Sequence, residues 1–518
     1  MTHPSQLARD RRGKAPAGRT ALVHRVGRSL AALGDWWPAR VTLPALFLLI
    51  ALPTTSFLAL AVPLGEVPDE PAHIDRAESL RHGEIIVGRK MFPDLGVPLA
   101  GGKIDPAPGL AGSTWTGSVP LPQKKLTAAR VAQLDAIGWW NHRQFVAFPN
   151  TAVYMPLFYL PAAIGLAVGR AAGLTPHASD LLARALGAIC FTLLGTLVLL
   201  AARRGRRLLF AGLTVPMTLW LAASVNEDGL MIAGYALAAA LLTRASGARG
   251  GAWWGAGLAL GLAIAVKPPY LPLAAMMLLP VALTRAASWR GRELRGLLFG
   301  VALASVPALL WAAAMAHFVA TPVRIDPPAH PGPLWPGDPH ALFRGPDMAA
   351  QLRVLLHDPA LLLTLPFRTI AADWSFKPHE LIGVLGPLDL VLPQPLYAFW
   401  FAALGLAVIG DLLAAPGEAV PTSSALSIAI ALAAAALTVL AIYDIQYLSW
   451  TDVGATRIEG VQGRYLLPVL VMVAAALPVW PVRNGRFWRG VLTLPVAGMA
   501  LFGLVYLPWL VVTTYYLR

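Results

Sequence analysis

A short polar segment, Val67–Arg76, carries the residue types that could do chemistry: the neighbouring carboxylates Asp69 and Glu70, followed by His73. Prolines at positions 68 and 71 interrupt helical hydrogen bonding on both sides of the carboxylate pair. If a helix begins again at Pro71, the two carboxylates lie at its positively polarised N-terminal end. Two carboxylates with a nearby histidine suit general-base catalysis or metal binding. The structural alternative is a solvated turn beside a membrane.

The elements that must position this segment are apolar. A run from about Val41 to Leu64 precedes it, and about 20 mostly apolar residues are enough to span a bilayer. The chain of 518 residues is 57% hydrophobic and only 13% charged, with a mean hydropathy of +0.61. We therefore expect an all-α polytopic membrane protein that places the polar segment at one membrane surface.

Charge and cysteine content narrow the functional classes. The net charge is +14, but the basic residues form short blocks between apolar runs, which indicates membrane topology rather than nucleic-acid binding. The single cysteine, Cys190, lies in an apolar run, so we expect neither a disulfide framework nor a cysteine metal site. Residues 1–40 are basic and lack an apolar signal core, which predicts a cytoplasmic tail near membrane lipid.

The arginine blocks predict which loops face the cytoplasm, because short cytoplasmic loops are rich in Lys and Arg. Thirteen arginines fall in four such blocks: Arg203–Arg207, Arg244–Arg249, Arg285–Arg295 and Arg483–Arg489. With a cytoplasmic N-terminus, all four face inward only if Thr151–Gly173 does not cross the membrane. We therefore expect this segment to be half-embedded, with eleven crossings and an outer C-terminus.

That topology gathers polar residues on the outer side. Glu227 and Asp228 occupy a short outer loop, where a helix-capping role for Asn226 or Asp228 is the alternative. Lys267 and Arg464 lie where an outer loop meets a span. This position suits an anion at the bilayer surface, and ordinary snorkelling of the side chains is the alternative.

The predicted organisation has four parts. They are a basic cytoplasmic tail (1–40), a membrane module (41–319) with a first outer loop (65–180), a proline-rich extracytoplasmic cap (320–392) and C-terminal transmembrane helices (393–518). The cap has about 70 residues and much proline, so it has little chance of burying a core of its own.

Several motifs resemble a bacterial family of multi-pass membrane proteins, the domain of unknown function 2142. They follow the family's order over about residues 45–475: Pro68–His73, Tyr154–Tyr159, Lys267–Tyr270, Ile382–Asp389 and Ile458–Tyr465. The family often has Tyr-Pro-Pro where this chain has Tyr154-Met155-Pro156, and a bulky residue in place of Pro387. Neither departure affects a charged position.

This family in turn resembles the GT-C glycosyltransferases. The resemblance implies a GT-C-like fold with about eleven transmembrane helices and a large first extracytoplasmic loop that contains a half-embedded segment. In that superfamily the loop opens with an acidic pair, and a second acidic site follows the third span. Asp69 with Glu70 and Glu227 with Asp228 match these two places.

The resemblance also implies an activity. A sugar would pass, with inversion, from a polyprenyl-phosphate donor to a glycan or lipid acceptor outside the bacterial cytoplasmic membrane. Asp69 would accept the acceptor's proton, and Glu70 or His73 would orient it. The donor phosphate would be bound by three residues: Lys267, Arg464 and Tyr465. A role for Mg²⁺ or Mn²⁺ at Asp69 and Asp228 stays open, because the superfamily contains both kinds of enzyme.

Two other functions stay open at this stage. A flippase for lipid-linked polysaccharide should carry ionisable residues in mid-span, whereas the apolar runs here are poor in them and Arg184 lies near an end. A polysaccharide polymerase or ligase would use a whole glycan as its donor, and nothing in the sequence excludes it.

Overall fold

The computed structural model describes residues 43–113, 125–245, 247–248, 250–279, 291–416 and 425–517. The expected basic tail (1–40) and three of the thirteen arginines, Arg249, Arg285 and Arg290, lie outside these residues.

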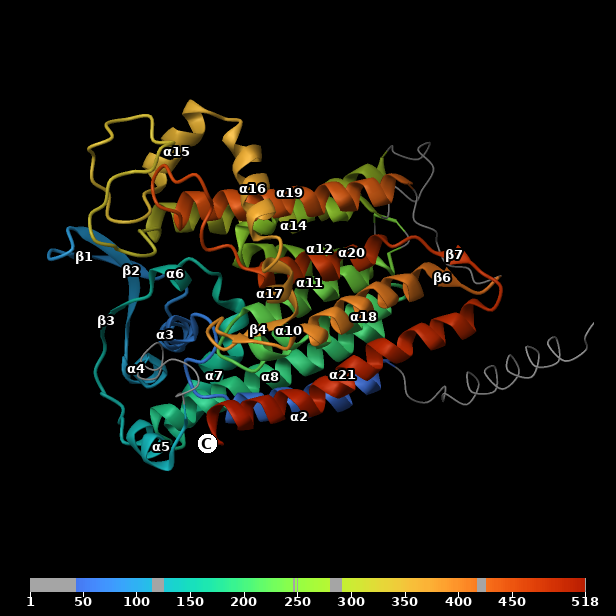
Figure 1. The fold of residues 1–518 in the computed structure, drawn as a ribbon, viewed down its shortest axis with the longest axis horizontal. Helices are drawn as coiled ribbons and strands as arrows, with labels where there is room; N and C mark the ends of the chain where they lie inside the picture. The colour runs from blue at the N-terminus through green and yellow to red at the C-terminus, as the bar shows by residue number, and fades with distance from the viewer. Residues whose placement is uncertain are drawn as a thin grey trace, which may run out of the picture.

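Long helices that run in one common direction dominate the fold (Figure 1). Within the described chain, six helices are long and apolar enough to cross a membrane, and a bent pair adds a seventh if it counts as one span. The six are α2 (Leu43–Ala61), α8 (Pro176–Ala201), α14 (Arg292–Phe318), α18 (Gln394–Leu412), α19 (Ala425–Ser449) and α21 (Gly485–Tyr515). The bent pair is α15 (Met348–His357) with α16 (Leu361–Asp373).

Shorter apolar helices fill the interior of the bundle. They are α7 (Leu160–Ala171), α9 (Arg206–Thr214), α10 (Pro216–Ala222), α11 (Asp228–Leu242), α12 (Gly251–Val266), η2 (Pro268–Leu278), η4 (Gly463–Leu466), α20 (Leu467–Val473) and η5 (Ala474–Ala476). Almost every residue of α11 is buried, so the protein core lies around this helix. Pro216 separates α9 from α10, because proline removes a helical hydrogen bond.

The structure therefore supports fewer membrane-spanning helices by length and apolarity than the eleven that the sequence predicts. Six or seven helices meet the length and apolarity of a span, and the remaining predicted spans correspond to the shorter interior helices. The number eleven stays a prediction. The predicted segment Thr151–Gly173 consists of α6 (Pro149–Ala152), η1 (Pro156–Tyr159) and α7, whose 12 residues are too few to span a bilayer alone.

Close packing fixes α7 against the first long helix that follows it. A Cβ atom at Gly165 would clash with the backbone of Ala183, and one at Gly169 would clash with Ser179. The two glycines are four residues apart, so they lie on one face of α7. Small residues at this spacing let two apolar helices approach closely, and they hold α7 along the N-terminal part of α8.

The chain between α2 and α8 carries several of the elements that build the site. After α2, helix α3 (Glu70–Arg81) begins one residue before Pro71, as its proline predicted. It is followed by β1 (Gly88–Phe92), β2 (Val97–Ile104), α4 (Ala107–Ser113), α5 (Ala128–Asp135) and β3 (Gln144–Ala147), all gathered at one end of the bundle (Figure 1). The three strands form an antiparallel sheet in the order β1-β2-β3.

The sequence predicts an all-α protein. The structure is mostly helical, but it also contains this sheet. Gly101 pairs with Gly88 on one side and with Ala147 on the other, and it leaves no room for a Cβ beside Val146. Glycine therefore allows the strands to approach closely. Two further short pairs join β4 (Val384–Leu385) to β5 (Leu390–Val391), and β6 (Leu413–Ala414) to β7 (Trp480–Pro481). The remaining helix, α17 (Lys377–Gly383), precedes β4.

Candidate functional site

Asp69 lies at one end of the bundle, at the residue before α3. Its backbone has φ +60°, and its side chain makes no capping hydrogen bond to the helix. A positive φ is uncommon for a residue other than glycine, and such strained residues concentrate at functional sites. The carboxylate is 39% exposed, and its Oδ2 accepts a hydrogen bond from Nη2 of Arg464 at 3.1 Å. Asp69 therefore presents a carboxylate to solvent beside a buried cation.

Arg464 lies in η4, buried at the start of an apolar helical segment. Its Nε is 3.8 Å from Oδ2 of Asp228, and neither Nε nor Nη1 makes a hydrogen bond to a described residue. Burial lowers the pKa of the guanidinium, but Tyr465, Asp228 and Asp69 raise it above the usual value. The arginine is therefore charged, lies between two carboxylates and has unused donors.

Lys267 lies further inside, between α12 and η2. Its Nζ forms ion pairs with Asp228 and, at 3.0 Å, with Oε1 of Glu227. The same nitrogen lies 4.9 Å from the ring centre of Tyr154 and 5.6 Å from that of Tyr465. Burial lowers the pKa of Lys267, whereas Asp228 and Glu227 raise it well above its usual value. Two carboxylates thus already balance the charge of this lysine.

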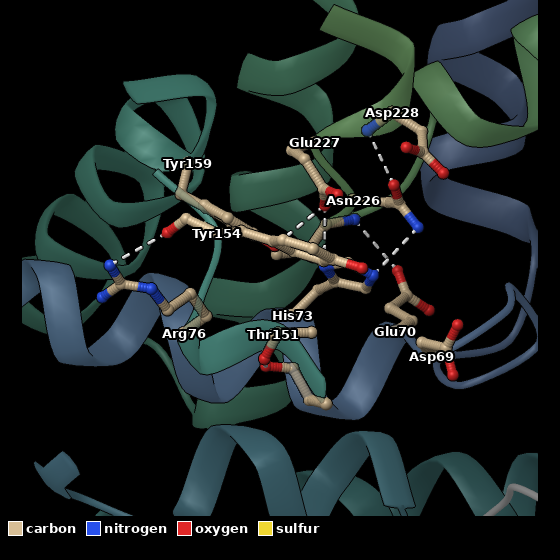
Figure 2. A network of polar contacts seen from close by, with 12 residues as sticks. Asp69, Glu70, His73, Arg76, Thr151, Tyr154, Tyr159, Asn226, Glu227 and Asp228 are labelled. Carbon is tan, nitrogen blue, oxygen red and sulfur yellow. Dashed lines mark hydrogen bonds and ion pairs between the residues drawn. The ribbon is translucent and has the colours of Figure 1, made fainter. Parts of the chain in front are cut away.

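His73 joins the network from α3 (Figure 2). Its Nδ1 lies 2.8 Å from Oε2 of Glu227 and 2.6 Å from the hydroxyl of Tyr159, which itself donates to Oε2 at 2.8 Å. The amide nitrogen of Asn226 lies 3.2 Å from Nε2. An amide NH₂ group only donates, so Nε2 accepts and Nδ1 carries the proton toward Glu227.

Burial raises the pKa of Glu227, but Lys267 and His73 lower it by more, so it lies well below the usual value. This carboxylate is therefore negatively charged and stabilised by its two partners. Because it is fully buried and already hydrogen bonded, it serves to position other groups.

Glu70 is turned toward the protein interior. Its carboxylate accepts hydrogen bonds from Nε of Arg184 at 2.7 Å, from the backbone of Gly65 at 2.9 Å and from the backbone of Val225 at 3.1 Å. The Glu70–Arg184 pair is fully buried, and Arg184 also donates to backbone carbonyls at the end of α2. Glu70 therefore ties α3, α8 and the turn before α11 together.

The structure thus separates the expected site residues into two layers. Asp69 and Arg464 form the outer layer, where the carboxylate meets solvent. Behind them lies a buried layer made of His73, Glu227, Asp228, Lys267 and the ring of Tyr465. Glu70 belongs to neither layer, because all its hydrogen bonds are to the scaffold.

Several residues of the site have only a weak signal in the sequence. Tyr159 and Asn226 contact His73 from positions 86 and 153 residues away. Arg76 donates to backbone carbonyls of Glu84, Ile85 and Tyr154, which fixes the chain after α2 around α3. Burial lowers the pKa of Arg76 to about 10, although Tyr159 and Glu84 raise it. Arg76 is one of two arginines in α3, and its spacing in the sequence does not indicate this role.

The two expected metal ligands do not form a metal site here. Asp69 and Asp228 face Arg464 from different sides, so a guanidinium already occupies the space between them. Within the described part of the chain, no three His, Cys, Asp or Glu side chains are arranged to hold a metal ion. Because both carboxylates face a guanidinium, Asp69 and Asp228 do not fit a divalent metal ion.

The fold and the site define a mostly helical membrane protein with a buried charged cluster at one end of its bundle. Comparison with protein families assigns residues 48–473 to the family described as predicted membrane protein (DUF2142). The chain belongs to this family, which confirms the resemblance seen in its motifs, and the matched range includes every site residue from Asp69 to Tyr465. Comparisons with curated proteins and with solved structures found no match.

The Glu70–Arg184 pair leads to a prediction about stability. Arg184→Met leaves a buried carboxylate without its cation, which should lower the free energy of unfolding by about 3–5 kcal/mol. The double variant Glu70→Leu/Arg184→Met removes both charges and should regain most of that loss. Thermal unfolding in detergent, followed by size exclusion, measures both. Equal stability of Arg184→Met and the unchanged protein would show that the pair is no anchor.

Proposed function

We propose that this protein is a membrane glycosyltransferase that uses a polyprenyl-phosphate-linked sugar. Its acceptor is a glycan or lipid of the cell envelope, and transfer takes place outside the bacterial cytoplasmic membrane. One observation carries the proposal: the exposed carboxylate of Asp69 lies beside Arg464, a buried arginine with two unused guanidinium nitrogens. The guanidinium can donate to a phosphate that displaces the Asp69 carboxylate from it, and the freed carboxylate can receive a proton from an acceptor hydroxyl.

The position of this pair supports a lipid-linked donor. Arg464 directly precedes the apolar helix α20, and Asp69 follows the span-capable helix α2 after a short turn. A donor whose lipid chain lies in the bilayer would bring its phosphate to this level. An acceptor hydroxyl would approach Asp69 from the solvent side, where the carboxylate is exposed.

The proposed reaction uses Asp69 as general base. Asp69 takes the proton of the acceptor hydroxyl while the hydroxyl oxygen forms a bond to the anomeric carbon of the donor sugar. The bond between that carbon and the phosphate oxygen breaks, and its electron pair leaves with polyprenyl phosphate. The anomeric centre is inverted. Arg464 stabilises the leaving phosphate, whose negative charge increases by one as the bond breaks.

The buried layer supports these two residues. Asp228 lies between Lys267 and Arg464, so it holds both cations in place. Lys267 adds positive charge behind the phosphate position, and the ring of Tyr465 packs against both cations. His73 orients Glu227 and, through α3, the backbone that carries Asp69. Glu70 is assigned a positioning role through its pair with Arg184.

The Asp69–Arg464 hydrogen bond suggests an order of events. While it is formed, Arg464 occupies one oxygen of the Asp69 carboxylate, so that oxygen is not free to take a proton. A donor phosphate competes for Arg464 and thereby frees Asp69. Both carboxylate oxygens of Asp69 would then be free to accept a proton only when a donor is present.

The finer topology belongs to the same proposal. We assign eleven crossings, a cytoplasmic N-terminus and a half-embedded α6–η1–α7 segment in a GT-C-like arrangement. Interior helices such as α11 and α12 are shorter than a typical span, but they are largely buried, so protein rather than lipid surrounds them. This assignment places Asp69 and Arg464 on the outer side.

The phosphate role predicts a loss of affinity for the donor. Arg464→Ala removes charged hydrogen bonds worth about 1.5–3 kcal/mol, so binding of polyprenyl phosphate should weaken by roughly 10- to 150-fold. Lys267→Ala should weaken it less, because two carboxylates already balance that charge. Titration of the purified protein measures both, with Arg344→Ala as the control on the outer surface. Unchanged affinity in Arg464→Ala would remove this arginine from the phosphate site.

The catalytic role of Asp69 predicts a loss of turnover. Asp69→Asn keeps the size of the side chain but cannot accept the proton, so turnover should fall by roughly 10²- to 10⁴-fold while donor affinity is retained. Sugar transfer from a synthetic polyprenyl-phosphate donor measures this effect. Asp94→Asn, at an exposed site in the same loop, is the matched control. Near-normal turnover of folded Asp69→Asn would end its assignment as base.

The topology predicts that the residues just before and just after α8 are labelled from opposite sides of the membrane. In a Cys190→Ala background, Ala172→Cys should react with a membrane-impermeant maleimide from outside the cell. Arg203→Cys should react only in inverted vesicles. Both positions are exposed, so accessibility depends on the side of the membrane. Reaction of Ala172→Cys only in inverted vesicles would overturn the proposed orientation and place the site in the cytoplasm.

A further inference from the structure

The helix α16 has one buried and one exposed apolar face. Leu361, Leu365 and Thr369 recur every four residues and are buried against the bundle. On the opposite face, Leu363 and Phe367 are 54% and 63% exposed, and Trp374, seven residues after Phe367, is 71% exposed. Large apolar side chains at helical spacing are thus left without a protein partner in the described structure.

The place of α16 indicates what covers this face. In Figure 1, α16 runs across the direction of the span-capable helix α19. The next helix, α17, brings Glu380 into electrostatic reach of Tyr443, which lies six residues before the outer end of α19 at Ser449. At 1.5 Å per residue this is about 9 Å along the helix. The chain that follows α16 therefore lies slightly below the outer end of α19, and most of the surface of α19 is not buried by protein.

Charged residues border the apolar face. Arg368 is exposed on α16, and Arg353 is exposed on α15, which meets α16 at a bend of 105°. Arginine can keep its stem against apolar surface while its head reaches lipid phosphate. Tryptophan concentrates at the same boundary between acyl chains and headgroups. Apolar side chains with an aromatic end and a basic border are typical of a helix that lies in a membrane interface.

We propose that α16 is an in-plane interfacial helix whose exposed face contacts the acyl chains of membrane lipid. Leu363, Phe367 and Trp374 insert beside α19, and Arg368 lies among the headgroups. The α15–α16 pair is then no membrane crossing, because its second helix runs along the bilayer surface. The apolar face of α16 and the lipid-facing surface of α19 form one continuous lipid contact.

This contact is linked to the candidate site. The hydroxyl of Thr369 accepts a hydrogen bond from the backbone of Ile458, and Glu380 accepts one from the backbone of Gly463, the residue before Arg464. A Cβ at Gly463 would clash with Lys377, so α17 packs directly on this backbone. Lipid that holds α16 thereby sets the level of Arg464 relative to the bilayer. This link rests on the proposed function, whereas the lipid contact itself does not.

Spin labelling tests the lipid contact without an activity assay. Single cysteines replace Leu363, Phe367 or Trp374 in a Cys190→Ala background, and the nitroxide-labelled protein is reconstituted into phosphatidylethanolamine–phosphatidylglycerol liposomes. Leu342→Cys is the matched control, because Leu342 is 61% exposed in the preceding outer segment. We expect the three α16 labels to be relaxed by oxygen and protected from Ni(II)EDDA, and the Leu342 label to show the reverse.

Two results would overturn the proposal. Ni(II)EDDA access at positions 363 and 367 equal to that at 342 would place this face in water. Spectral broadening that disappears on dilution with unlabelled protein would show that a second copy of the chain covers it. Either result leaves the role of Asp69 and Arg464 untouched, because their tests measure turnover and donor binding.

Discussion

The structure depends on Arg464, whose guanidinium is buried between two carboxylates at one end of an apolar helical bundle. A buried charge is costly unless it is paired, so the chain must bring acidic groups to it. Asp69 and Asp228 meet this requirement from two different helix starts, and Asp69 does so from 395 residues away in the sequence. The chain after α2 and the segment around η4 are thereby joined.

The same requirement explains the order of charges behind Arg464. Asp228 also binds Lys267, which binds Glu227, which in turn accepts a hydrogen bond from His73. Positive and negative groups alternate, and each buried charge has an opposite neighbour. The exception is Arg464, because two of its guanidinium nitrogens make no hydrogen bond to a described residue and the third is bonded to the one carboxylate that remains partly exposed. This imbalance is what makes the outer end of the network a candidate site for an anion.

Much of this arrangement could be predicted from the sequence, because apolar runs and prolines determine helix ends locally. The restart of α3 beside Pro71, and the placement of Asp69, Asp228 and Arg464 at helix ends, follow from such signals. The ion-pair partners of the charged side chains could not be predicted in this way. The sequence places Glu70 beside Asp69, yet Glu70 turns inward to Arg184, 114 residues away. The sequence places Lys267 at a membrane boundary, but it does not indicate that Glu227 and Asp228 are its ion-pair partners.

The small sheet and the number of spans show the same limit. Strand pairing around Gly101 depends on contact with Ala147, and no local pattern in a polar loop indicates it. Interior helices such as α11 are apolar on all sides because protein surrounds them, so composition alone does not distinguish them from membrane-spanning helices.

The central claim is that Arg464 receives the phosphate of a lipid-linked donor and releases Asp69. The most direct measurement is a cryo-electron microscopy map of the purified protein with bound polyprenyl phosphate. We expect phosphate density within hydrogen-bond distance of the Arg464 guanidinium, Nη2 included, with the Asp69 carboxylate turned away from it. Phosphate density at another place on the protein, with the Asp69–Arg464 hydrogen bond intact, would contradict the account.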